Sequence, residues 1–138
     1  MVYPETLDDV DVLAHTVYGE ALGESPEGQI AVAWVIRNRV AKGRNYLGKT
    51  IKDVCLKPYQ FSCWNLGDAN RQKLLNLQID DKSYLKIRKI AEQVLNGALP
   101  DNTKGSIHYH ANTIKPDWKK GKAPVVTIGN HLFYNDID

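Results

Sequence analysis

The segment EGQIAVAWVIRNRVAKG, residues 27–43, constrains the fold more than any other part of the chain. Ser25 and Pro26 supply an N-cap and a first-turn proline, and Gly43 ends the segment, so it predicts one helix. Residues 30–36 are apolar on nearly all sides of that helix, whereas a surface helix has a single apolar stripe. We therefore expect this helix to be buried at the centre of the domain.

Further helices are predicted on both sides of this segment. Residues 6–9 have the form of a capping box, and apolar residues then recur at helical intervals, which predicts a helix from about residue 7 toward residue 18. Gly19 and Gly23 bracket Glu20, where this helix should loosen or end. A helix is expected to end at Asn96-Gly97, and a shorter one to lie around residues 71–77. Residues 44–68 are predicted to form an aromatic-rich binding loop.

Beyond residue 100 the pattern changes from helical to extended. Residues 107–111, 125–128 and 131–135 are predicted strands, and the two-residue turn Gly129-Asn130 joins the last two. The fold class is therefore α+β, with the helices first and a small antiparallel sheet near the C-terminus. The 138 residues contain 43% hydrophobic and 25% charged residues, which is typical of one globular domain spanning 1–138.

Composition also limits the kinds of binding partner that we expect. The net charge is +2 and the basic residues are dispersed, so a nucleic-acid partner is not expected. We find neither an apolar run long enough for membrane insertion nor the basic and apolar regions of an export signal. The chain is therefore expected to be made in the cytoplasm. Cys55 and Cys63 could form one disulfide or remain two buried thiols.

Glu20 and Glu24 form the first candidate for a catalytic site. On a helix they would share one face, and many glycosidases pair a proton-donating carboxyl with a second carboxylate about 5–9.5 Å away. Both could equally be solvated glutamates at a helix end, with Glu24 beside the positive N-terminus of the next helix. Apolar segments on both sides of Glu20 favour a raised pKa for its carboxyl, as a general acid requires.

Histidines and aromatic residues offer further candidates. On a strand His108 and His110 would point the same way, and together with His131 and either Glu20 or Asp117 they could bind zinc. The histidines could instead shape a sugar cleft or serve a structural role. Cys63 with a histidine could form a thiol-protease dyad. The aromatic rings outside the helices suit either pyranose stacking or core packing: Tyr59, Phe61, Trp64, Tyr109, Trp118 and Tyr134.

Four segments of the chain resemble the SleB/CwlJ-like cell-wall hydrolases in order and spacing. They are TVYGEALGESPEGQIAVAWVIRNRV (residues 16–40), KPYQFSCWN (57–65), HYHANTIKPDW (108–118) and IGNHLFY (128–134). The best-known members of that family degrade spore-cortex peptidoglycan. The resemblance implies a lysozyme-like α+β domain in which Glu20 alone is the acid/base catalyst. It also implies lytic transglycosylation of peptidoglycan glycan strands between N-acetylmuramic acid and N-acetylglucosamine, with Glu24 reduced to a cap or subsite residue.

The interpretation that we carry forward is a monomeric enzyme without metal or cofactor. Its glycan groove is predicted to be lined by Glu24, Gln60, Phe61, Ser62, Trp64, Tyr109, His110, His131 and Tyr134. The alternatives are a hydrolytic muramidase, a zinc- or cysteine-dependent amidase or peptidase, and a non-catalytic wall-binding module. A domain without an export signal is similar to a phage endolysin, which reaches the wall through a holin, or to a piece of a longer secreted protein.

Overall fold

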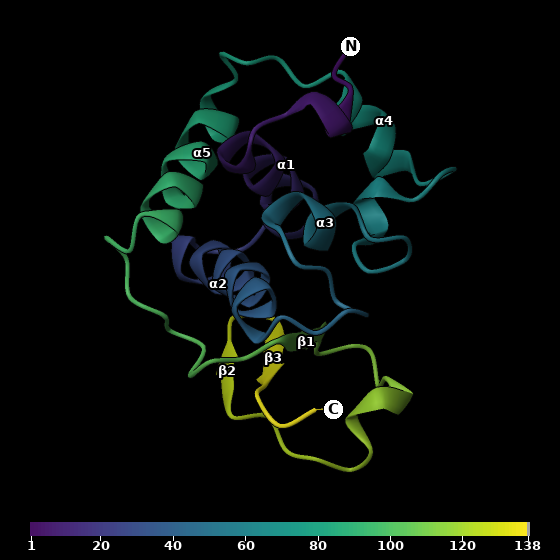
Figure 1. Ribbon diagram of the computed structural model, residues 1–138, viewed down its shortest axis with the longest axis vertical. Coiled ribbons are helices and arrows are strands. Elements are labelled where there is room, and N and C mark those ends of the chain that lie inside the picture. Colours follow the sequence, from purple (N-terminus) through teal and green to yellow (C-terminus); the bar gives the residue numbers. More distant parts are fainter. Residues whose placement is uncertain (138) are drawn as a thin grey trace.

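The computed structural model describes residues 1–137, and Figure 1 shows helices packed at one end and a small sheet at the other. The elements in chain order are η1 (Pro4–Thr6), α1 (Asp9–Ala21), α2 (Pro26–Lys42), α3 (Ile51–Leu56), η2 (Ser62–Trp64), α4 (Ala69–Leu75), α5 (Lys82–Leu95), β1 (His108–Ala111), η3 (Asp117–Lys119), β2 (Val126–Ile128) and β3 (His131–Tyr134). The predicted α+β order is confirmed. None of the helices in residues 1–137 is both long and apolar enough to cross a membrane.

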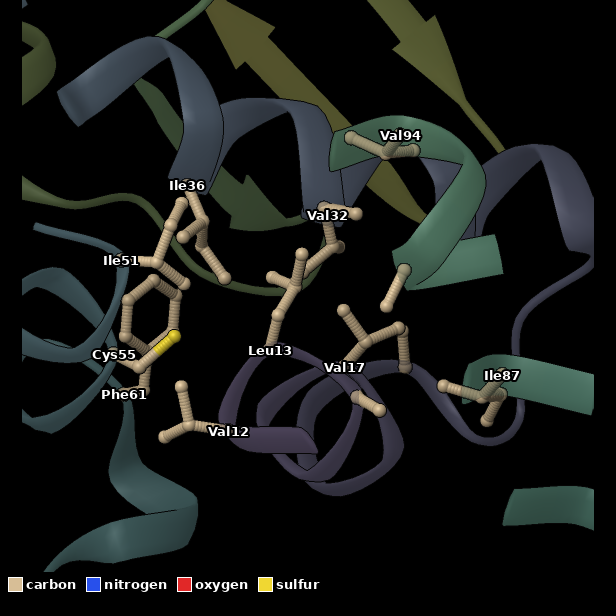
Figure 2. Packing of buried hydrophobic residues seen from close by; sticks show 14 of the residues in the cluster. Val12, Leu13, Val17, Val32, Ile36, Ile51, Cys55, Phe61, Ile87 and Val94 are labelled. Carbon is tan, nitrogen blue, oxygen red and sulfur yellow. The ribbon is translucent and has the colours of Figure 1, made fainter. Parts of the chain in front are cut away.

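Helix α2 lies between the helical core and the sheet. Val32 and Ile36 point into the main core toward Leu13 of α1 (Figure 2), whereas Ala31 and Val35 form a second cluster with Phe133 of β3. Burial on both sides explains why this helix has no polar stripe. Its predicted ends are confirmed, because the Ser25 side chain accepts a hydrogen bond from Gly28 N and Gly43 closes the helix at φ 67°.

Helix α1 differs from its prediction at its N-terminal end. Asp8, not Thr6, is the N-cap, and its carboxylate accepts from Asp11 N at 2.8 Å. The Thr6 hydroxyl instead donates to Tyr3 O at 2.7 Å inside η1. At the other end the helix continues past residue 18 to Ala21, so it ends between Gly19 and Gly23 as predicted and Glu20 lies in its last turn. Gly19 is helical, and its small size serves tertiary packing rather than helix termination.

The predicted loop at residues 44–68 contains two short helices. Thr50 caps α3 by accepting from Asp53 N at 3.0 Å, and Ile51, Val54 and Cys55 are buried. Elements as short as α3 and η2 are too brief to show apolar periodicity, so the pattern did not indicate them. Helix α4 begins two residues before the predicted 71, and α5 ends at the predicted Asn96-Gly97, with Gly97 at φ 81°.

The three strands form an antiparallel sheet in the order β1-β3-β2. The register pairs Tyr109 with Phe133 and Ala111 with His131, so these side chains share one face. That face packs on α2, since Tyr109 and Phe133 belong to the cluster formed with Ala31 and Val35. The β1 and β3 residues between them point to the opposite face.

Candidate active site

Three separate elements meet at the carboxyl group of Glu20. The residue lies in the last turn of α1, and its Oε2 accepts a hydrogen bond from the backbone N–H of Cys63 in η2 at 3.3 Å. Its Oε1 accepts from the hydroxyl of Tyr109 in β1 at 3.3 Å. Both carboxylate oxygens are therefore held by donors from other parts of the fold.

The surroundings of Glu20 favour its protonated form. Burial raises the pKa of this carboxyl above its ordinary value, the hydrogen bonds from Cys63 and Tyr109 oppose the rise, and the negative charge of Asp68 adds to it. The net direction is upward, as expected from the sequence. A carboxyl with a raised pKa keeps its proton to higher pH than an exposed one does, which suits a general acid.

Glu24 has different partners, and its pKa is shifted in the opposite direction. Its Oε1 accepts from Asn130 N at 3.2 Å and its Oε2 from Asn130 Nδ2 at 3.1 Å, while His131 Nδ1 lies 3.8 Å from Oε1. Burial alone would raise the pKa of Glu24, but the Asn130 hydrogen bonds and His131 outweigh it and the pKa is lowered. Glu24 is thus an ionised residue that joins the α1–α2 connection to the β2–β3 turn.

Two glycines make room for the Glu24 side chain. A Cβ on Gly28 would lie 2.9 Å from Glu24 Cβ, and a Cβ on Gly129 would lie 2.7 Å from Glu24 Oε1. Gly129 also has φ 56°, the left-handed region that favours glycine. Asn130, predicted only as a turn residue, proved to be the main partner of Glu24, a contact that no local sequence pattern indicates.

Strand alternation divides the groove residues that the sequence predicted. Tyr109 and His131 lie on the sheet face toward the helices, where Tyr109 reaches Glu20. His110 and Tyr134 lie on the other face with Trp118. His110 Nδ1 donates to Ala111 O at 2.8 Å, and its Nε2 lies 2.8 Å from the Tyr134 hydroxyl oxygen. The structure does not bring His110 and Tyr134 together with Glu20.

The same alternation separates the residues of the zinc hypothesis. His108 and His110 share the face that carries Trp118, whereas His131 is on the helix-facing side beside Glu24. In residues 1–137 no three side chains from His, Cys, Asp and Glu lie close enough together to hold a metal ion. The ligand set that a zinc amidase would need is not assembled.

The middle segment supplies both buried and exposed residues. Phe61 is only 2% exposed and packs in the core beneath the Arg39 guanidinium, 5.2 Å from its ring centroid. Gln60 is exposed and accepts from Arg39 Nη1 at 3.4 Å, and Ser62 is exposed. Trp64 donates from Nε1 to Thr16 Oγ1 at 2.9 Å, one helical turn before Glu20 on α1.

Trp64 also lines a groove of ≈ 270 Å³. The other residues of this groove were not among the predicted glycan-groove residues: Leu56, Pro58, Tyr59, Asn65 and Leu66. Tyr59 and Leu66 are each 86% exposed, and Tyr59 has the unusual φ of 65° for a residue other than glycine. Exposed apolar side chains around a groove are typical of a binding surface.

Cys63 is unsuited to act as a nucleophile. Cys55 and Cys63 are both free, buried thiols. Burial first, and then the carboxylate of Glu20, raise the pKa of the Cys63 thiol far above its ordinary value, which disfavours the reactive thiolate.

We expect Cys63→Ala to retain wall-degrading activity within about 10-fold of wild type, because its backbone N–H still donates to Glu20. The lost thiol should cost about 1–2 kcal/mol of unfolding free energy. Turbidity loss of purified cell walls and urea unfolding measure the two effects. Complete loss of activity in a folded variant would instead support the cysteine-dependent alternative.

Comparison with known proteins identifies the family of this chain. The chain belongs to the cell wall hydrolase family, whose sequence profile matches residues 23–134, a segment that begins just after Glu20. The spore cortex-lytic enzyme of Oceanobacillus iheyensis is 29% identical over 126 residues, which are 91% of this chain and 41% of the relative. That of Bacillus subtilis is 27% identical over 129 residues, 91% of this chain and 37% of the relative. The chain thus spans about two fifths of the length of these relatives.

Solved structures cover the chain more completely. The catalytic domain of the germination-specific lytic transglycosylase SleB from Bacillus anthracis is similar with a TM-score of 0.70 and 28% identity, over 95% of this chain and 98% of that domain. The catalytic domain of the Bacillus cereus SleB protein has the same TM-score and identity, over 91% of this chain and 88% of that chain. The resemblance predicted from the sequence and the lysozyme-like α+β fold are confirmed.

Proposed function

We propose that this chain cleaves peptidoglycan glycan strands between N-acetylmuramic acid and N-acetylglucosamine, as a lytic transglycosylase in which Glu20 is the only acid/base. One observation carries the proposal: Glu20 is a half-buried carboxyl with a raised pKa, whereas Glu24 is an ionised carboxylate held by Asn130. A single proton donor with no second carboxylate free to act suits a reaction in which the sugar supplies its own nucleophile.

The chemistry can be written with one carboxyl. Glu20 donates its proton to the glycosidic oxygen as the bond from C1 to that oxygen breaks. The 6-hydroxyl of the same muramic acid residue then attacks C1, and its proton passes to the Glu20 carboxylate, which restores the acid. The products are a free N-acetylglucosamine end and a 1,6-anhydro-muramic acid end, and no water is consumed.

The contacts of Glu20 support both of its roles. The N–H of Cys63 and the hydroxyl of Tyr109 stabilise the carboxylate that remains after proton donation. Burial in turn raises the energy of that carboxylate and prepares it to accept a proton from the attacking hydroxyl. Of the predicted groove residues, Ser62 and Gln60 are exposed, and Trp64 lines the groove beside Tyr59, so we propose this segment as the glycan-binding surface.

Mass spectrometry of the soluble fragments released from purified cell walls tests this function. When the wild-type chain digests the walls in buffer that contains a chelator, we expect muropeptides that end in 1,6-anhydro-muramic acid. Fragments heavier by one water molecule would instead indicate a muramidase, which hydrolyses the same bond with the same carboxyl group. Cleaved peptide stems on intact glycan would indicate an amidase or peptidase, and binding without release would indicate a wall-binding module.

A further inference from the structure

A continuous series of contacts leads from Glu24 to Glu20 through two aromatic side chains. The Glu24 carboxylate faces His131 Nδ1 at 3.8 Å, and the His131 ring meets the Tyr109 ring edge-on with centroids 4.9 Å apart. The Tyr109 hydroxyl then donates to Glu20 Oε1 at 3.3 Å. The two glutamates therefore lie at opposite ends of one packed series of side chains.

The Glu24 end of this series is held by hydrogen bonds and close packing. Its side chain is only 12% exposed, and both carboxylate oxygens accept hydrogen bonds from Asn130. Gly28 and Gly129 pack so closely against this side chain that a Cβ at either position would overlap it. A buried anion fixed in this way attracts the imidazole edge that faces it, and among residues 1–137 His131 Nδ1 has no hydrogen-bond partner to compete with that attraction.

The Tyr109 ring is confined from two sides. His131 packs against it edge-on at an interplanar angle of 65°, and Phe133 stacks on it at 28° with centroids 5.6 Å apart. Because the ring cannot tilt without displacing one of these neighbours, its hydroxyl is directed at Glu20. The position of that hydroxyl thus depends on His131, and the position of His131 depends on Glu24.

We propose that Glu24 and His131 are positioning residues, which act through Tyr109 to hold the Glu20 carboxyl in place for proton transfer. This inference rests on the proposed function and gives Glu24 a role other than a nucleophile, a helix cap or a sugar contact. It also explains why the β2–β3 turn is joined to the α1–α2 connection, directly after the helix that carries the catalyst.

A double-mutant cycle tests the inference. Tyr109→Phe keeps the ring but removes the hydroxyl, and we expect kcat for release of soluble fragments to fall about 10-fold. Glu24→Gln keeps the side-chain size but removes the charge that faces His131, and we expect kcat to fall about 5-fold with KM unchanged. In the Tyr109→Phe background Glu24→Gln should cause no further loss, since the hydroxyl through which it acts is gone.

The pH profile supplies a readout that a merely structural role would not change. The Tyr109 hydrogen bond lowers the pKa of Glu20, so its loss raises that pKa further and the protonated acid persists to higher pH. The alkaline limb of kcat/KM should therefore shift to higher pH in Tyr109→Phe, and in the same direction in Glu24→Gln. The other titratable or charged groups that influence Glu20, Tyr109 or His131 electrostatically are unchanged in both variants: Cys63, Asp68, Arg39 and His110.

Glu27→Gln is the matched control, because Glu27 is an exposed glutamate in the first turn of α2 and its substitution should leave kcat unchanged. If Glu24→Gln lowers the thermal transition, His131→Phe replaces it in the cycle, since it keeps a ring beside Tyr109 and removes the nitrogen that faces Glu24. Additive losses, a change in KM alone, or wild-type kcat in Glu24→Gln would overturn the inference. The proposed function fails separately, if Glu20→Gln remains active or the products are not anhydro sugars.

Discussion

We expect Glu20→Gln to abolish the turbidity loss of purified cell walls, while the thermal unfolding transition stays close to that of the wild type. The amide cannot donate the proton that the leaving oxygen requires, and the loss of a general acid costs about 10²–10⁴-fold in rate. Glutamine has nearly the same shape, and its amide oxygen can still accept from Cys63 N–H or from the Tyr109 hydroxyl. The substitution therefore separates the chemistry from the fold.

Turbidity assays and calorimetry on the same preparation measure this result, and binding to insoluble peptidoglycan shows whether the glycan groove survives. The expected variant is folded, binds the wall and releases no soluble fragments. Wild-type lysis by Glu20→Gln would remove Glu20 from the mechanism. Loss of lysis together with a large drop in the melting temperature would show that Glu20 serves the fold rather than the reaction.

Local sequence features predicted those parts of the fold that depend on local interactions. Helix α2 could be placed at the centre because residues 30–36 are apolar on nearly all sides of the helix and leave no face suited to water. Its ends, at Ser25 and Gly43, follow from capping chemistry that involves only neighbouring residues. The turn at Gly129-Asn130 is equally local, and it joins β2 to β3 as expected.

The composition of the site was less predictable, because it depends on contacts between distant segments. Alternation indicated that His108 and His110 share a face, but the face that meets the helices is set by the pairing of β1 with β3. That pairing turns Tyr109 toward Glu20 and turns His110 away from it. Likewise, the bond between Glu24 and Asn130 spans 106 residues, and neither residue carries a local signal for it.

Gly19 has a second role that a local rule does not indicate. A glycine near a predicted helix end is ordinarily a termination signal, and α1 does end two residues later at Ala21, but Gly19 itself is helical. A Cβ at Gly19 would lie 2.6 Å from Cys63 Cβ, 2.8 Å from Cys63 Sγ and 3.0 Å from a methyl group of Leu74. The residue is small so that η2 can approach α1 closely enough for Cys63 N–H to reach Glu20.

We therefore expect Gly19→Ala to impair both stability and activity. Alanine favours a helix by about 1 kcal/mol over glycine. The overlap with the Cys63 Cβ, which is not a flexible side-chain end, should cost about 1–3 kcal/mol and outweigh that gain. Displacement of η2 would lengthen the Cys63–Glu20 hydrogen bond, and an error of about 1 Å at a catalytic group can reduce the rate about 100-fold.

Gly23→Ala provides the control, because it makes the same substitution in the connection that follows Glu20, where a Cβ would meet nothing within 4 Å. Urea unfolding should show a lower free energy for Gly19→Ala than for Gly23→Ala, and wall-lysis rates measured well below both unfolding midpoints should differ in the same sense. Equal stability and activity in the two variants would mean that η2 can move away from α1 at little cost. In that case the Cys63 hydrogen bond would not be what holds the Glu20 carboxyl in place.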